Sequence, residues 1–231
     1  MPAKTPNAEE TTIVIEPVRK AHVSLTLVGD SDLILHKRPL SVDAPMLFKQ
    51  SHPKGTKLPT SVDQPYNMWE KLITSIHWRD PVPVLDDWSL YDEDMWKDLM
   101  SNNAPQIVGK AFKDTWTEAF ISFFRSSTGL KGTDFKRSVV LHGTKLPITF
   151  ANVTYDQHLT PNNGINPVPV IAQYNQFAGW KCEVMLSHVD TVIPTDTIIN
   201  LIQTAGEFIG VGTRRAEGFG RYHIEDVNVS K

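Results

Sequence analysis

The most informative stretch of this chain reads Gly210-Val211-Gly212-Thr213-Arg214-Arg215-Ala216-Glu217-Gly218-Phe219-Gly220. Its four glycines allow the backbone to take positive φ angles without steric cost. Backbone amides that face outward in such a stretch can form a concave anion-binding surface, and two adjacent arginines add forked donors that suit phosphate. The composition therefore predicts either an anion-binding loop or a tight structural connection, and it favours neither.

Two familiar phosphate-binding loops are excluded. A P-loop requires a Lys-Ser/Thr pair, which does not follow here, and a Rossmann loop follows a strand. This stretch instead follows residues 195–209, whose apolar spacing is that of an amphipathic helix. The loop thus begins at the negative end of a helix dipole, so a phosphate would depend on Arg214, Arg215 and the loop amides. The alternative is a glycine-capped helix that leads into an edge strand.

Regular elements are predicted on both sides of the loop. Apolar residues recur with helical spacing or alternate with polar ones, which predicts helices at 107–124 and 195–209 and strands at 22–36 (with a turn at 29–32), 180–189 and 221–229. Two more strands, 138–142 and 145–153, flank Gly143-Thr144 as a candidate hairpin, and residues 156–176 are expected to form a long loop. This order predicts an α+β fold, most economically a ferredoxin-like β-α-β-β-α-β core.

Residues 39–105 differ in character from the rest of the chain. They contain eight prolines and four of the six tryptophans, so they cannot form one regular element. Short helices are expected at 66–76 and 91–100. We interpret this segment as a large Pro/Trp-rich insertion in a single domain spanning residues 21–231, preceded by a flexible N-terminal segment at 1–20.

Charge and composition limit the class of protein. The net charge of −3 argues mildly against nucleic acid, but the charges are unevenly distributed. Residues 104–150 carry seven Lys or Arg against three acids (7 − 3 = +4), and residues 86–98 carry six acids against one Lys (1 − 6 = −5). The alternative is two ordinary solvated faces. The single cysteine, Cys182, excludes an internal disulfide, and without a signal or membrane segment we expect a cytoplasmic protein.

The stretch from Ile209 to Arg221 closely resembles the C-terminal glycine-rich signature of the RAMP superfamily (repeat-associated mysterious proteins), the RNA-binding subunits of CRISPR effector complexes. Residues 105–113 more loosely resemble the superfamily's proline-led start of the first helix, without its usual Gly-Ser pair. The layout from Phe112 to Gly220 is also similar to that of phage-encoded RAMP-like proteins. The resemblance covers the C-terminal half and the first strand. It implies a modified RRM-like core, binding of single-stranded RNA or DNA, and head-to-tail assembly along the strand.

The candidate nucleic-acid-binding residues follow from the loop, the end of the first strand and this resemblance. We expect phosphate contacts from cationic side chains, backbone from glycines, and a stacking or a core role for Phe219; the set is His36, Lys37, Arg38, Lys110, Lys113, Gly212, Arg214, Arg215, Gly218, Phe219, Gly220 and Arg221. No metal-ligand spacing and no cofactor motif is present. His36, His142 or His158 would be the candidates for a catalytic histidine, although structural roles fit them better.

Three functions remain open. The first is a non-catalytic protein that binds single-stranded RNA or DNA, as a homo-oligomer or within a CRISPR-like or phage complex. The second is a metal-independent endoribonuclease that uses a histidine. The third is an interaction protein that acts through protein contacts of its acidic, Trp-rich segment.

Overall fold

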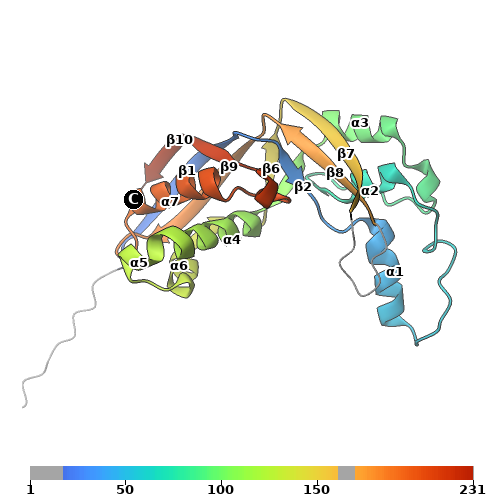
Figure 1. Ribbon diagram of the computed structural model, residues 1–231, viewed down its shortest axis with the longest axis horizontal. Helices are drawn as coiled ribbons and strands as arrows, with labels where there is room; N and C mark the ends of the chain where they lie inside the picture. The colour runs from blue at the N-terminus through green and yellow to red at the C-terminus, as the bar shows by residue number, and fades with distance from the viewer. Residues whose placement is uncertain (1–17, 161–169, 231) are drawn as a thin grey trace, which may run out of the picture.

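The computed structural model describes residues 18–160 and 170–230, and two antiparallel sheets form its framework (Figure 1). The large sheet has the strand order β10-β1-β9-β6-β4-β3, with β5 also paired to β9, and the small sheet has the order β2-β8-β7. The strands are β1 (Lys20–Gly29), β2 (Leu33–Leu35), β3 (His77–Trp78), β4 (Pro105–Val108), β5 (Val139–His142), β6 (Lys145–Thr149), β7 (Asn152–Thr160), β8 (Val170–Ala178), β9 (Lys181–Val189) and β10 (Tyr222–Ser230).

Helices cover one face of the large sheet and surround the small one (Figure 1). They are α1 (Leu40–Ser51), α2 (Met68–Thr74), α3 (Glu93–Asn102), α4 (Gly109–Ala119), α5 (Arg125–Thr128), α6 (Gly132–Ser138) and α7 (Thr195–Phe208). A π-turn at Phe120–Phe124 continues α4 into α5, and short 3-10 turns occupy Trp88–Leu90 and Arg215–Glu217. The mixture of helices and antiparallel sheet confirms the predicted α+β class.

The main core lies between the large sheet and the helices α4 and α7. Alternate residues of β1 and β9 are buried, as their period-two pattern predicts. At the centre, the indole N–H of Trp116 on α4 donates to the hydroxyl of Tyr222 on β10 at 2.9 Å, and both side chains are fully buried. Gly206 brings α7 onto the same strand, because a Cβ there would lie 2.1 Å from the Tyr222 carbonyl. The last strand and the preceding loop are therefore fixed by the core.

A second group of aromatic residues joins the small sheet to α2 and α3. Trp69, Trp96 and Tyr155 lie with ring centroids 5.3–5.9 Å apart, and the Trp96 indole N–H donates to the buried Asn175 side chain at 2.8 Å. Helix α1 has no buried residue and stands apart from both sheets (Figure 1). Most of residues 39–105 thus lies beside the small sheet, with β3 and β4 at the edge of the large one.

Two predictions about local structure are wrong. Strands β5 and β6 both pair antiparallel with β9, so they run in the same direction, and Gly143 (φ 91°) bends one path instead of closing a hairpin. Residues 156–176 are not a long loop: 156–160 and 170–176 belong to the paired strands β7 and β8. Their remaining positions, 161–169, lie outside the described residues. So do residues 1–17 of the segment expected to be flexible, whereas Lys20 already belongs to β1.

Candidate nucleic-acid interface

The glycine loop, residues 210–220, connects α7 to β10 and lies against β2. Thr213 N donates to the Ile34 carbonyl at 3.0 Å, and Gly220 N donates to the Asp32 carbonyl at 2.8 Å. Val211 N donates to the Gly220 carbonyl at 2.9 Å and closes the loop on itself. Because these three amides are bonded within the protein, they are not free to bind an anion. Only some of the loop amides can therefore face outward, as the sequence predicts for the loop.

Close packing explains two of the glycines. Gly212 has φ 86°, and a Cβ there would lie 2.6 Å from the Ile34 carbonyl oxygen. Gly220 has φ 71°, and its Cβ would lie 1.8 Å from the Val211 carbonyl oxygen. A larger residue at either position would both strain the backbone and push the loop away from its neighbours. The loop is thus a docked connection that holds its exposed side chains beside the end of β2.

Arg214 links the loop to the hairpin of β7 and β8. Its guanidinium forms a two-pronged ion pair with Glu217, with Nε 2.8 Å from Oε1, and lies 3.4 Å from the Asp156 carboxylate. It also lies over the rings of Tyr174 and Phe219, 5.7 and 5.6 Å from their centroids. The hydrogen bonds to Glu217 raise the pKa of Arg214 and lower that of the carboxylate. Phe219 therefore packs under a guanidinium, which favours the packing role over base stacking.

Arg215 has a carboxylate partner as well. Its Nη1 lies 3.0 Å from Glu118 Oε2 and 3.4 Å from the Thr115 hydroxyl, both on α4. The arginine side chain is 34% exposed and the glutamate 53%. Since each loop arginine already neutralises an acid, a phosphate would have to compete for either. Their role as phosphate contacts stays a prediction.

The cations at the end of β2 differ in this respect. Lys37 and Arg38 are exposed, and neither forms an ion pair with a carboxylate in the described part of the chain. The amide of Lys37 donates to the Ser75 carbonyl at 2.7 Å, which fixes the backbone at this point. The ring of His36 meets the ring of Tyr174 edge-on, with centroids 5.3 Å apart. The end of β2 thus presents two unneutralised cations, Lys37 beside the glycine loop and Arg38 beside α1.

The other predicted residues are placed differently. Lys110 forms an ion pair with Asp114 one turn along α4. Lys110 and Lys113 line another groove, between the start of α4 and the β5–β6 bend. Arg221 is mostly held within the protein, and its Nη1 is buried without a hydrogen-bond partner. The predicted cations therefore do not form one continuous surface.

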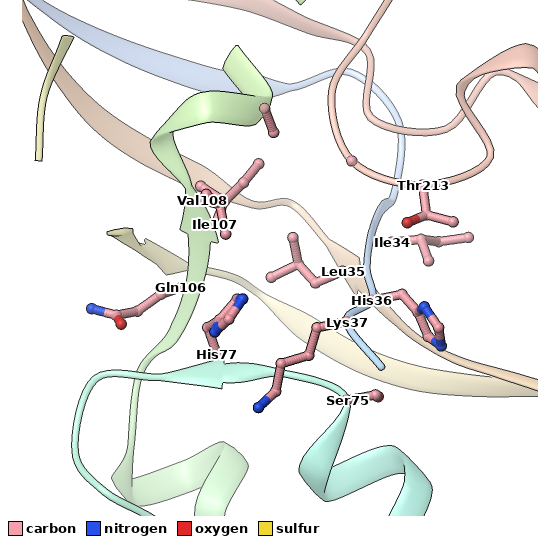
Figure 2. Close-up of a pocket in the computed structure, with 12 residues that line it drawn as sticks. Ile34, Leu35, His36, Lys37, Ser75, His77, Gln106, Ile107, Val108 and Thr213 are labelled. Atoms are coloured by element: carbon pink, nitrogen blue, oxygen red, sulfur yellow. The ribbon is translucent and has the colours of Figure 1, made fainter. Parts of the chain in front are cut away.

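Two residues that sequence reasoning missed join Lys37. Figure 2 shows the pocket between β2, β4 and the glycine loop, where the Lys37 side chain extends toward β3, which carries His77. This pocket has a volume of about 170 Å³ and includes Gly212 and Thr213 in its wall. Lys145 lies next to it and, with Lys37, lowers the pKa of His77 further than burial alone does. No local pattern marks these residues, because they meet only through the pairing of β3, β4 and β6.

One histidine pair lies on the exposed face of the large sheet. His142 Nε2 is 2.5 Å from the Ser187 hydroxyl, which lies 2.9 Å from Nδ1 of His22. His158, another candidate, contacts Asp156 at 2.8 Å.

Among residues 18–160 and 170–230, no group of three or more His, Cys, Asp or Glu side chains is arranged to hold a metal ion. In the same part of the chain, no helix combines the length and apolar character needed to cross a membrane.

The chain was compared with protein families, curated proteins and solved structures. No protein-family model matches the chain, and no curated protein matches it. Among solved structures, it is similar to a chain of the Type III-B Cmr-beta complex bound to cognate target RNA, with 14% identity and a TM-score of 0.47. The match covers 92% of this chain and 61% of that chain. It is also similar to Cmr6 from Pyrococcus furiosus (12% identity, TM-score 0.42), with 90% of this chain and 100% of that chain covered. Likenesses of this size carry no argument about function.

Proposed function

We propose that this chain is a RAMP-like protein that binds single-stranded RNA or DNA without acting on it chemically. The observation that carries the proposal is the pair of exposed, unneutralised cations at the end of β2: Lys37 beside the docked glycine loop and Arg38 beside α1. Charge of this kind supplies most of the affinity of a protein for a polynucleotide backbone. The predicted contacts of Arg214 and Arg215 become secondary, since their carboxylate partners must first be displaced.

The strand order supports the same proposal. The order β10-β1-β9-β5, with α4 before β5 and α7 before β10, is the order expected if these elements form a ferredoxin-like core whose second strand is extended by β6. Residues 39–105 are then an insertion between its first strand and first helix. We further propose head-to-tail assembly of copies along the strand, in a homo-oligomer or a CRISPR-like complex. Two measurements on the purified protein test this directly: its absorbance ratio at 260 and 280 nm, and its apparent mass in size-exclusion chromatography.

A double variant tests the binding proposal. Lys37→Gln with Arg38→Gln is expected to weaken binding of a fluorescent single-stranded RNA by tenfold or more, as measured by anisotropy at several salt concentrations. Each lost phosphate contact lowers the salt slope by about 0.7 for a single strand. The control is Lys136→Gln with Arg137→Gln, a Lys-Arg pair in the last turn of α6, at the opposite end of the molecule from α1 (Figure 1). Equal affinities and slopes for both double variants and the native protein would rule out the proposed contact.

One observation favours a second function, metal-independent RNA cleavage. His22 and His142 lie on either side of the Ser187 hydroxyl, so two imidazoles are spaced to act as base and acid on one phosphodiester. One imidazole would take the proton of a 2′-hydroxyl, whose oxygen attacks the adjacent phosphorus. The other would donate a proton to the departing 5′-oxygen, leaving a 2′,3′-cyclic phosphate. Incubation of end-labelled RNA with native protein and with His142→Ala in chelator decides the matter: absence of products from native protein excludes cleavage.

A further inference from the structure

Two adjoining pockets share the side chains of Lys37 and His77. The first, shown in Figure 2, lies between β2, β4 and the glycine loop. The second, of about 210 Å³, is also lined by Lys145, Trp78 and Asp80. Both pockets therefore meet at one group of basic side chains, which we call the β3 cation group: Lys37, Lys145 and His77, whose ring carries a charge only when it is protonated.

This group carries more positive charge than its surroundings neutralise. Burial, followed by the positive charge of Lys145, lowers the pKa of Lys37, and Asp43 opposes this shift. Asp80 is the carboxylate in the wall of the second pocket, and it pairs with Arg79 at 2.8 Å. No ion pair among the described residues joins a carboxylate to any member of the β3 cation group. Like charges held together in this way favour an added anion.

Backbone contacts fix the main-chain positions of these three residues. Ser75 accepts the amide of Lys37 at 2.7 Å. His77 is paired with Gln106 across β3 and β4, and Val108 of β4 is paired with Lys145 of β6. Three segments far apart in the sequence are thus held in register around one space. Because these contacts already hold the three backbone segments, only the side chains would need to be ordered around an anion.

Neutral donors complete the wall. The side chains of Gln106 and Thr213 line the first pocket, and neither makes a hydrogen bond within the described part of the protein. A tetrahedral oxyanion has enough acceptor oxygens to use ammonium, imidazole and amide donors at once. The volume of each pocket suits one such group and not a nucleobase with its sugar.

We propose that the β3 cation group is a phosphate-binding site that holds one phosphate of the bound single strand. The inference rests on the proposed function and adds to it the group that is recognised. That phosphate is either an internal phosphodiester or a phosphomonoester at the end of the strand. Both present oxygens to Lys37, His77 and Lys145, but the monoester carries the larger charge and would bind more tightly in a site with several cations.

Lys145→Gln and His77→Gln test the site in the full-length protein. The matched control is Lys181→Gln, which removes a lysine of the same sheet that already pairs with Glu225 at 2.8 Å. Single-stranded RNA of one sequence, with either a 5′-phosphate or a 5′-hydroxyl, is titrated by anisotropy, and thermal melting checks that each variant is folded. Lys145→Gln is expected to lower affinity about tenfold, the loss typical of a charge-assisted hydrogen bond. Lys181→Gln should change affinity less than twofold.

The outcomes separate the two proposals. Failure of the native protein to bind either RNA would overturn the proposed function. Native binding that Lys145→Gln and His77→Gln both leave unchanged would overturn the phosphate site alone. A loss seen only with the 5′-phosphorylated RNA assigns the site to a strand end, and an equal loss with both RNAs assigns it to an internal phosphate. Inorganic phosphate should displace RNA from native protein more than chloride of equal ionic strength does, and equal displacement by both would count against the site.

Discussion

Gly212 provides the sharpest test of how the glycine loop works. Gly212→Ala forces a side chain into a backbone with φ 86°, which costs about 1–2 kcal/mol for a residue other than glycine. The added Cβ would also lie 2.6 Å from the Ile34 carbonyl, so the loop must move away from β2. That movement breaks the bond from Thr213 N to the same carbonyl, which is worth about 1 kcal/mol. The expected total loss of unfolding free energy is about 2–3 kcal/mol.

Gly218 supplies a matched control in the same loop. It has φ 92°, but a Cβ there would have nothing within 4 Å. Gly218→Ala therefore carries only the backbone strain of about 1–2 kcal/mol. For a chain of this length, 1 kcal/mol lowers Tm by about 2–4 °C, so the two variants should differ by several degrees in calorimetry. Equal Tm values would refute the argument that the loop is docked on β2, and an RNA affinity unaffected by Gly212→Ala would show that docking does not position the binding cations.

Three further predictions concern charge and the core. Glu118→Gln frees Arg215 and should strengthen RNA binding about two- to threefold, as measured by anisotropy. It should change the unfolding free energy by less than about 1 kcal/mol in thermal melting, because the pair is partly exposed. Unchanged affinity would show that Arg215 has a structural role and does not contact RNA. Tyr222→Phe leaves the buried Trp116 N–H without an acceptor and should lower the free energy of unfolding by about 1–3 kcal/mol in denaturant titration. A smaller decrease would show that this hydrogen bond does not stabilise the core. In the free protein, burial and two lysines lower the pKa of His77, whereas a bound phosphate favours the protonated ring. RNA affinity should therefore rise as pH falls from about 8 to 6, and His77→Gln should flatten this profile.

The helices and strands of the main core were predictable because one physical rule decides each of them. Helix α7 and the strands β1 and β9 each bury one face, so apolar residues recur with the matching period. The pairing of β7 and β8 was missed because the Pro, Asn and Gly residues at positions 161–169 dominate the composition of the 156–176 stretch. Helix α1 was also missed: Pro39 precedes it, Pro45 lies inside it, and only Leu40 and Ala44 pack partly against the core, which is too few to create a pattern.

The candidate site was only partly predictable for a related reason. The pairing of Arg214 with Glu217 is local, at i and i+3, and the spacing could have indicated it. The partner of Arg215 comes from α4, almost a hundred residues earlier, and His77 and Lys145 reach Lys37 only through strand register. Sequence reasoning therefore locates the cations but not which of them remain unneutralised, and that property decides where an anion binds.

The small number of unneutralised cations also limits how one copy of the protein can bind. If Lys37, Arg38 and Lys145 each replace one counterion, the logarithm of the binding constant should fall with the logarithm of salt with a slope of about −2. Three contacts on a chain of net charge −3 give weak binding at physiological salt. Tight binding would then require several copies on one strand, because linked sites multiply their affinities. A slope near −2 on a short RNA and a several-fold steeper slope on a long one would indicate assembly along the strand, and equal slopes on both would exclude it.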